Sequence, residues 1–386
     1  MSTDLTAYTG AEILDGETIH KGHALLCEGG RVKAVAPPGE LPEGCTLKAL
    51  QGGLICPGFV DLQVNGGGGV MLNDAPSPET IATICKAHLP FGTTSLLPTL
   101  ITDTPARMAE ARRAAKAALA QGVAGVIGLH FEGPHIAPAR KGAHDPALIR
   151  PMEAEDLAFL EAAAAELPTL MITLAPESAR PEEIRALAAA GAIVSLGHSD
   201  ADYPAAMEAV RAGATCTTHL FNAMSQLAAR APGLVGAALE SGALHAGLIA
   251  DGIHVDPATI RIALRAKAGP GRIFLVTDAM AVIGSDLAEF TLNGRRILRR
   301  DGRLTLVDGT LAGADLDMIS AVRFMVESIG IGREEALRMA SLYPAELIGR
   351  SGEIGRLAPG TRADFLHLDD DLDILGVWQG GIRRLP

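Results

Sequence analysis

Short apolar runs alternate with longer amphipathic stretches through the middle of the chain. The intervening stretches carry helix signals: in the segment from Pro181 to Gly191, proline opens the helix, acids fill its first turn and glycine ends it. Repeated strand–helix units are typical of a parallel sheet, and a closed (β/α)8 barrel or a large open sheet would give nearly the same pattern. The number of runs favours the barrel; they cover residues 58–65, 93–99, 125–132, 170–177, 192–199, 215–221, 245–252 and 272–279.

Both ends of the chain have a different pattern, with short runs typical of β-strands. Near the N-terminus, Gly29 and Gly30 stand between two alternating runs, which indicates a hairpin. Similar runs return at residues 362–368 and 374–384. We therefore expect residues 1–55 and 350–386 to combine into one small β domain, with the catalytic barrel at residues 56–349.

Composition narrows the class of protein. Hydrophobic residues make up 48% and charged residues 20%, a balance typical of a packed α/β enzyme. The net charge of -12 argues against a sequence-independent nucleic-acid binder, which needs clustered cations. The N-terminus lacks a signal-peptide pattern, and no apolar run approaches the roughly 18 residues of a membrane span, so we expect a cytoplasmic protein without membrane or nucleic-acid partners. Neither a disulfide framework nor a zinc knuckle is indicated by the scattered cysteines, which are Cys27, Cys45, Cys56, Cys85 and Cys216.

Ionisable and amide side chains recur where the predicted strands end. In (β/α)8 barrels the catalytic groups lie at the carboxyl ends of the strands. Such residues are more frequent here than solvated strand ends require, so we expect one site at this rim. They are Gln63, Asn65, Glu132, His198, His219, Asp251, His254 and Asp278.

Three of these residues form a candidate metal site. Glu132, His198 and His219 supply one carboxylate and two imidazoles, which leaves a coordination position open for water, as in catalytic zinc sites. Each alone could be a hydrogen-bonded rim residue; together they favour a metal. Gln63 and Asn65 occupy the positions of the His-x-His pair found after the first strand of many metal-dependent barrel hydrolases, and carboxamides are poor ligands for transition metals. We expect one divalent ion per subunit, with zinc favoured and iron, cobalt or manganese compatible.

Further residues suit proton transfer and anion binding. Asp278 ends an apolar strand, where it could exchange protons with a bound water and a leaving amine, or cap the following helix. Arg230 and His254 could bind a substrate phosphate with backbone donors from Asn222 and Ala223, although an exposed arginine is often only solvated surface. The glycines at 66–69 match no nucleotide-binding motif and favour a flexible or close-approach loop.

The motifs, taken in order, resemble those of the N-acetylglucosamine-6-phosphate deacetylases in the amidohydrolase superfamily. The resemblance extends from about residue 8 to the C-terminus, and the combination is far more specific than any single motif. It rests on Pro57-Gly-Phe-Val-Asp-Leu-Gln-Val-Asn-Gly, His130-Phe-Glu-Gly-Pro-His, Lys141-Gly-Ala-His, Leu174-Ala-Pro-Glu, Gly197-His-Ser, Thr218-His-Leu-Phe-Asn-Ala-Met, Arg230-Ala-Pro-Gly, Ala250-Asp-Gly-Ile-His-Val-Asp, Val276-Thr-Asp-Ala and Thr310-Leu-Ala-Gly.

The resemblance implies a fold and an activity. The fold would be a (β/α)8 TIM-type barrel with a small β-sandwich formed from both termini, commonly in a homodimer. The activity would be metal-dependent hydrolysis of the N-acetyl group of N-acetyl-D-glucosamine 6-phosphate, in amino-sugar catabolism and cell-wall recycling. A cyclic amide or another N-acetylated sugar phosphate stays open as substrate, and so does a catalytically silent phosphosugar sensor.

The resemblance also implies roles for matching positions. Glu132, His198 and His219 would be the metal ligands, Asp278 the acid and base, and His144 a neighbour of the substrate carbonyl. Two departures stand out. His135 occupies the position of a phenylalanine in many relatives, where it could contact a ligand or only pack, and packing is favoured; Ala314-Asp315 replaces the usual hydroxyl-bearing residues. The substrate would be surrounded by Gln63, Ala143, His144, Asn222, Ala223, Arg230, Asp251, His254, Leu311, Ala312 and Gly313.

Overall fold

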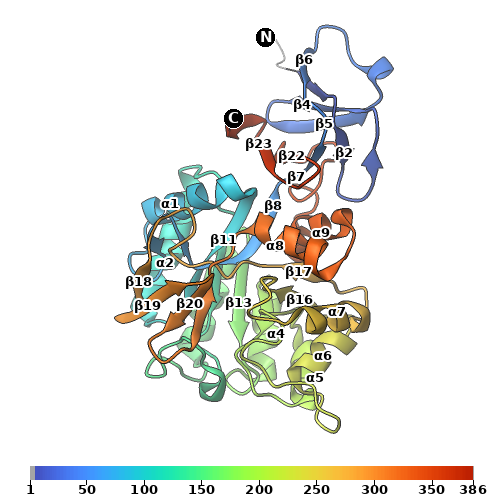
Figure 1. Cartoon of the computed structure of the whole chain (residues 1–386). Helices are drawn as coiled ribbons and strands as arrows, with labels where there is room; N and C mark the ends of the chain where they lie inside the picture. The colour runs from blue at the N-terminus through green and yellow to red at the C-terminus, as the bar shows by residue number, and fades with distance from the viewer. Residues whose placement is uncertain (1–4, 386) are drawn as a thin grey trace.

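The structure, a computed structural model, describes residues 5–385. Residues 1–4 and 386, the outermost positions of the predicted small domain, lie outside the described residues. Figure 1 shows a β-rich part at the top, which contains both chain ends, above a larger part of strands and helices. The prediction that the two ends combine is therefore confirmed.

The small part is a sandwich of two sheets. One has the order β5-β4-β1-β6 and the other β24-β23-β22-β7-β2-β3. The hairpin predicted at Gly29 and Gly30 joins β4 to β5, with both glycines at positive φ. The strands are β1 (Thr6–Thr9), β2 (Glu12–Leu14), β3 (Ile19–His20), β4 (Ala24–Glu28), β5 (Arg31–Ala36), β6 (Thr46–Ala49), β7 (Leu54–Pro57), β22 (Phe365–Leu368), β23 (Ile374–Gln379) and β24 (Ile382–Leu385), with a short 3-10 turn at Pro38–Glu40.

Three aromatic rings lock the two sheets together. Tyr8 on β1 meets the edges of Phe365 on β22 and Trp378 on β23, with ring centroids 4.9 and 5.5 Å away. Phe365 and Trp378 stack at 4.6 Å. Buried aromatic pairs of this kind add about 0.5–1.5 kcal/mol each beyond their burial. The N-terminal and C-terminal segments thus share one core although they are far apart in sequence.

The larger part is the predicted barrel. Its parallel strands follow the order β17-β16-β15-β14-β13-β12-β11-β8, and backbone bonds between the ends of β17 and β8 close the ring. Each of the eight predicted runs coincides with one strand, and β11 extends two residues beyond its run. They are β8 (Phe59–Val64), β11 (Thr93–Ile101), β12 (Leu129–Glu132), β13 (Leu170–Leu174), β14 (Ile193–Leu196), β15 (Cys216–Thr217), β16 (His245–Leu248) and β17 (Ile273–Leu275), with the short hairpin of β9 (Gly66–Gly67) and β10 (Val70–Met71) after β8.

Helices cover the outside of the barrel in Figure 1. Several begin with proline at the first turn after a side-chain cap; Ser77, Thr104, Asp202 and Asp256 each accept a backbone N–H. The helices are α1 (Pro78–His88), α2 (Pro105–Ala120), α3 (Ala154–Glu166), α4 (Pro181–Ala189), α5 (Tyr203–Ala212), α6 (Gly233–Glu240), α7 (Pro257–Ala266), α8 (Met318–Phe324), α9 (Arg333–Ala340) and α10 (Leu342–Leu347), with short turns at Leu89–Phe91, Pro138–Arg140 and Met325–Ile329.

A four-stranded antiparallel sheet follows the last barrel strand, and the sequence analysis did not predict it. Its order is β18-β19-β20-β21, and it lies beside the barrel in Figure 1. The turn signals Asn293-Gly294 and Asp301-Gly302 join its first three strands and could have revealed it. The strands are β18 (Glu289–Leu292), β19 (Arg295–Arg300), β20 (Arg303–Leu306) and β21 (Leu311–Ala314).

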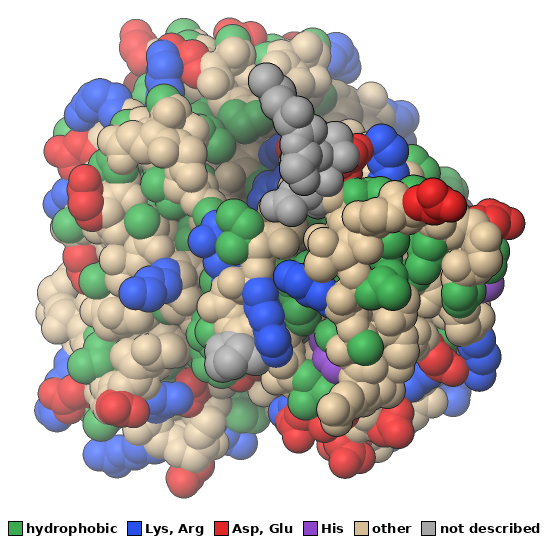
Figure 2. All heavy atoms as spheres, turned by 90° about the horizontal axis from the view of Figure 1, so that it is seen from above, with side chains coloured by type: hydrophobic (Ala, Val, Ile, Leu, Met, Phe, Trp, Pro, Cys, Tyr) green, Lys and Arg blue, Asp and Glu red, His purple; other side chains and the backbone are tan. Residues whose placement is uncertain are grey.

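Charge is spread over the surface. Figure 2 shows acidic and basic side chains mixed across the face that carries the small part. No helix among residues 5–385 combines the length and apolar character that a membrane span needs.

Candidate active site

A pocket opens where the carboxyl ends of the barrel strands meet. Its lining combines most of the predicted polar residues with Thr310 and an apolar wall from Ile101, Ile249, Met280 and Leu292, none of which was predicted as a site residue. Met280 follows Asp278 by two positions, so the strand pattern could have indicated it, whereas Leu292 comes from the unpredicted sheet. The polar lining comprises Asn65, Glu132, His144, His198, His219, Asn222, His254, Asp278 and Thr310.

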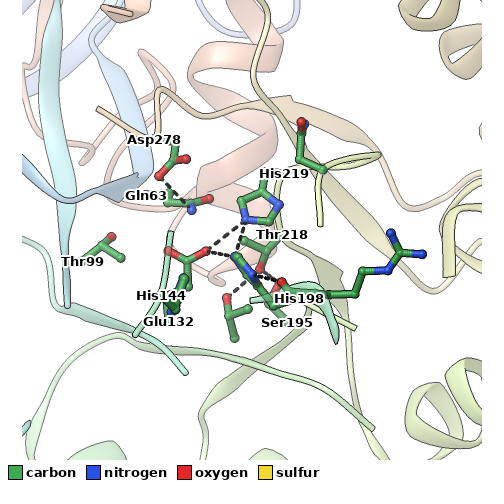
Figure 3. Close-up of polar contacts among 12 residues, drawn as sticks. Gln63, Thr99, Glu132, His144, Ser195, His198, Thr218, His219 and Asp278 are labelled. Atoms are coloured by element: carbon green, nitrogen blue, oxygen red, sulfur yellow. Dashed lines mark hydrogen bonds and ion pairs between the residues drawn. The ribbon is translucent and has the colours of Figure 1, made fainter. Parts of the chain in front are cut away.

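Glu132, His198 and His219 converge at the floor of this pocket (Figure 3). Glu132 ends β12, and the two histidines follow β14 and β15. Glu132 Oε1 lies 3.1 Å from His198 Nε2 and 3.0 Å from His219 Nε2, and the two nitrogens are 3.0 Å apart. All three side chains are buried. Residues separated by up to 87 positions thus present three ligand atoms to one point.

The donor set fits a divalent metal. His198 Nδ1 lies 2.7 Å from the carbonyl oxygen of Arg140, and because a carbonyl only accepts, Nδ1 carries the hydrogen. In the neutral ring, Nε2 then turns a lone pair toward the Glu132 carboxylate and toward His219. Lone pairs and a carboxylate repel one another unless they share a cation, and this second-side hydrogen bond is the usual way to orient a metal-binding imidazole.

The site is built on strained backbone. His198, His219 and Asp278 have φ values of 47, 32 and 52°, in the left-handed region that side chains other than glycine seldom adopt. Ala223, on the pocket wall, has a φ of 49°. Such strain costs of order 1–3 kcal/mol per residue and tends to concentrate at functional sites.

Asp278 faces the same pocket and is held by two amides. Asn65 Nδ2 and Gln63 Nε2 donate to Asp278 Oδ1 at 2.6 and 3.2 Å. Burial, with the nearby negative charge of Glu132, raises the pKa of Asp278 to about 6. Among the described residues no donor reaches Oδ2, so this oxygen is available to a ligand. The side chains of Gln63 and Asn65 therefore hold the Asp278 carboxylate.

His144 forms part of the pocket wall as a neutral imidazole. Its Nδ1 lies 2.7 Å from Thr102 Oγ1, and its ring centroid is 4.3 Å from that of His198. Burial lowers the pKa of His144 well below its usual value. The preceding residue, Ala143, accepts a hydrogen bond from Arg295 on β19 through its carbonyl. The additional sheet thus helps to hold the wall that carries His144.

His254 lies on another wall of the pocket, with Asp251 behind it. Their Nδ1 and Oδ2 atoms are 2.6 Å apart, and Asp251 Oδ1 also accepts the backbone N–H of Ile253 and His254 at 2.8 Å. Burial alone would raise the pKa of the Asp251 carboxyl, but the interactions with the His254 side chain and with the backbone N–H groups of Ile253 and His254 together outweigh it, so that the pKa is lowered. Asp251 therefore orients the imidazole without lining the pocket itself.

Some of the residues predicted to surround the substrate line the pocket, and others do not. Asn222, Ala223, Leu311 and Gly313 line the pocket, as do Ala143, His144 and His254. Gln63 and Asp251 lie behind the lining, Ala312 is buried in an apolar cluster, and Arg230 is exposed outside the pocket.

The two departures from the family pattern have structural explanations. His135 is fully buried with Nδ1 3.1 Å from the Arg150 carbonyl, and it is absent from the pocket lining, as expected for a packing residue. Asp315 forms a two-pronged ion pair with Arg299 of β19 at 2.7 and 2.9 Å. This pair connects β19 to the residue directly after β21 of the same sheet.

Comparisons with known proteins agree with this site. The Amidohydrolase family profile matches residues 54–383. The N-acetylgalactosamine-6-phosphate deacetylase of Shewanella sp. (strain ANA-3) is 46% identical over 333 residues, covering 86% of this chain and 83% of the relative. The N-acetylglucosamine-6-phosphate deacetylase of Homo sapiens is 42% identical, with 86% and 85% covered. A crystal structure of the N-acetylglucosamine-6-phosphate deacetylase from Pasteurella multocida superimposes with a TM-score of 0.95 at 37% identity, covering 99% of this chain and 100% of that one. With its closed barrel, its Glu-His-His cluster and these relatives, the chain belongs to the amidohydrolase family, among the deacetylases of N-acetylated hexosamine 6-phosphates.

Proposed function

We propose that this protein hydrolyses the N-acetyl group of N-acetyl-D-glucosamine 6-phosphate to give D-glucosamine 6-phosphate and acetate, in amino-sugar catabolism and cell-wall recycling. The observation that carries the proposal is the pairing of the Glu132-His198-His219 cluster with a buried carboxyl, Asp278, in one pocket. A metal site together with an acid–base group is the equipment that hydrolysis of an unactivated amide requires.

Glu132, His198 and His219 would hold one divalent ion per subunit, with zinc favoured and iron, cobalt or manganese compatible. When bound, such an ion lowers the pKa of a water and polarises a carbonyl oxygen. The buried, preorganised ligands keep that chemistry away from bulk solvent.

Asp278 would accept and donate the protons in this reaction. With Oδ1 held by Asn65 and Gln63, the free Oδ2 can take a proton from the attacking water. The same carboxyl then gives the proton to the sugar nitrogen as the C–N bond breaks, so that the amine leaves neutral. The raised pKa of Asp278, about 6, suits a group that must both accept and return a proton.

His144 would stabilise the amide oxygen. The Thr102 hydroxyl lies 2.7 Å from Nδ1 and 3.4 Å from the carbonyl oxygen of Glu132, and donation to the nearer Nδ1 leaves the hydrogen of the neutral ring on Nε2. That N–H can donate to the amide oxygen as negative charge develops on it.

The sugar and its phosphate would be bound by His254, by Arg230 and by the backbone of Asn222, Ala223 and residues 311–313. Arg230 is exposed in the single chain. We therefore propose a homodimer in which Arg230 reaches the pocket of the neighbouring subunit. We also propose a cytoplasmic location.

An acetate-release assay on the purified protein, with metal analysis of the same sample, tests the proposal. Release of acetate from N-acetylglucosamine 6-phosphate by the metal-loaded form is the expected result. Metal-loaded protein that releases no acetate would point to the silent sensor instead. The 46% identity to a galactosamine-type deacetylase favours a second candidate substrate, the C4 epimer, and kcat/KM for both sugars ranks the two.

A further inference from the structure

Asp61 is a buried carboxyl that the proposed reaction does not use. It lies on β8 with 0% exposure. Its Oδ2 accepts the Thr277 hydroxyl at 2.5 Å, and its Oδ1 accepts the backbone N–H of Thr277 and of Gln63 at 3.3 and 3.2 Å. Burying a carboxyl in a barrel interior is costly, and such positions are normally filled by branched apolar residues.

These bonds lie where the two ends of the barrel sheet meet. β8 and β17 are the two ends of the eight-stranded sheet, and β17 stops at Leu275. Beyond it the ring closes through backbone bonds from Asp278 to Gln63 at 3.0 Å and from Asn65 and Gly66 to Ala279 at 2.8 and 3.1 Å. The Asp61–Thr277 pair adds side-chain bonds to this seam, directly before Asp278.

Thr277 also reaches across Asp278. Its hydroxyl oxygen accepts the backbone N–H of Ala279 at 3.3 Å while its hydrogen goes to Asp61. Asp278, between them, has the left-handed φ of 52°. A strained residue stays in such a conformation only when its surroundings fix it. The threonine fixes the backbone on both sides of the strained position, and Asp61 fixes the threonine.

The inner face of β8 therefore contacts two consecutive residues of the opposite edge. Asp61 holds Thr277, and Gln63 and Asn65 hold the carboxylate of Asp278. Alternation along the strand places positions 61, 63 and 65 on one face. The bonds of Asp61 fix the backbone beside Asp278, and the bonds of Gln63 and Asn65 orient the Asp278 carboxylate.

We infer that Asp61 and Thr277 form a clasp of positioning residues, which holds the Asp278 carboxylate in the orientation needed for proton transfer. The inference rests on the role proposed above for Asp278. Neither clasp residue lines the pocket. A clasp of this kind acts on kcat, because misplacing a proton-transfer group by about 1 Å can cost about 100-fold in rate while ground-state contacts stay in place.

The test is Thr277→Val, which keeps the shape of the side chain and removes the hydroxyl. We expect kcat for acetate release to fall by about 10- to 100-fold, with KM and metal content unchanged. Thr277→Ser restores the hydroxyl and should recover most of the lost rate. The matched control is Thr169→Val, at another buried barrel threonine, whose hydroxyl has no partner within residues 5–385.

A second variant covers the case in which Thr277→Val does not fold. Asp61→Asn is isosteric and weakens the same bonds, so it should also lower kcat at unchanged KM. Because both changes break one clasp, the double variant should be no slower than the slower single variant. Any of three results would overturn the clasp. The first is a full kcat in Thr277→Val or in Asp61→Asn, and the second is a loss of rate in Thr277→Ser equal to that in Thr277→Val. The third is a loss of rate that is explained by loss of the metal.

Asp278→Asn, measured in parallel, separates this inference from the proposed function. An inactive Asp278→Asn beside a fully active Thr277→Val would refute the clasp and leave the proposed function standing. A fully active Asp278→Asn would refute the role of Asp278 and, with it, the clasp. Wild-type protein without acetate release would refute the function itself.

Discussion

Asn65 donates a 2.6 Å hydrogen bond to Asp278, from a position where many metal-dependent barrels carry a histidine ligand. In the proposed mechanism the first strand thus supports the acid–base group, while the candidate metal cluster draws its ligands from other strands. Under the same proposal this arrangement leaves the metal to a carboxylate and two imidazoles from three other strands. It also makes the geometry of Asp278 dependent on contacts across the seam of the barrel.

Asp278→Asn should abolish most turnover. The change keeps the size of the side chain and removes its ability to accept a proton, and general acid–base groups contribute about 10²- to 10⁴-fold to rate. Metal content and binding of the substrate should persist, because Asp278 is outside the ligand set. Steady-state kinetics and metal analysis of the purified variant check this, and a near-normal kcat would contradict the assignment.

Glu132→Gln should remove the metal and the activity together. The carboxylate supplies the only negative charge of the three clustered ligands, and a carboxamide is a much weaker ligand. Chelation of the wild type should have the same effect and lower its Tm, since a metal that binds only the folded state stabilises it. Restored activity on adding zinc to the chelated wild type, but not to the variant, completes the test. Full activity in metal-free protein would exclude a catalytic ion.

Asp61 should make the unfolding free energy depend on pH. Burial raises its pKa from 3.8 to about 7. Between these values the folded state keeps a proton that the unfolded state has lost, so this group's contribution to stability falls as pH rises from about 4 to about 7. At about 1.4 kcal/mol per pKa unit, the change amounts to a few kcal/mol.

Asp61→Asn removes that titration, which gives the measurement. Denaturant unfolding of the metal-loaded wild type and variant at pH 5 and pH 7.5 should show the stability advantage of the wild type shrinking at the higher pH. An advantage that is constant or grows with pH would show that the Asp61 pKa is not raised.

The sequence predicted the parts of this molecule that depend on periodic patterns and strand ends. Each of the eight apolar runs coincided with a strand, because a buried parallel strand must be apolar on both faces. Glu132, His198, His219 and Asp278 could be expected at one rim because parallel strands end together.

Hydrogen bonds between side chains and distant segments could not be predicted from periodic patterns and strand ends. Asp61 lies in a run that reads as an ordinary strand, and nothing local shows that its partner is Thr277, more than two hundred residues away. Similarly, the contact of Arg295 with the Ala143 carbonyl depends on how the additional sheet folds back. Arg230 was predicted near the phosphate from its motif, yet one chain leaves it exposed.

Arg295→Met should weaken substrate binding. The guanidinium holds the carbonyl of Ala143 and so the wall that carries His144. A hydrogen bond from a charged group contributes about 1.5–3 kcal/mol, so we expect KM to rise by about tenfold or more. Arg296→Met is the matched control on the same strand, because its exposed ion pair with Glu289 contributes only about 0–1 kcal/mol. Equal KM values in the two variants would show that the contact with Ala143 is not used.

Arg230→Ala should raise KM for the 6-phosphate while leaving the unphosphorylated sugar unaffected, since only the phosphate gains from the cation. Hybrid dimers decide which subunit the arginine serves. One subunit carries Arg230→Ala and the other carries Asp278→Asn, so only the pocket of the first retains Asp278. If Arg230 crosses the interface, that pocket receives an intact arginine from its partner, and the hybrid shows a wild-type KM at about half the wild-type rate per dimer. If Arg230 serves its own chain, the same pocket lacks the arginine and the hybrid keeps the raised KM. A hybrid of this second kind would contradict the proposed exchange across the dimer, and equal KM changes for both sugars would contradict the phosphate contact itself.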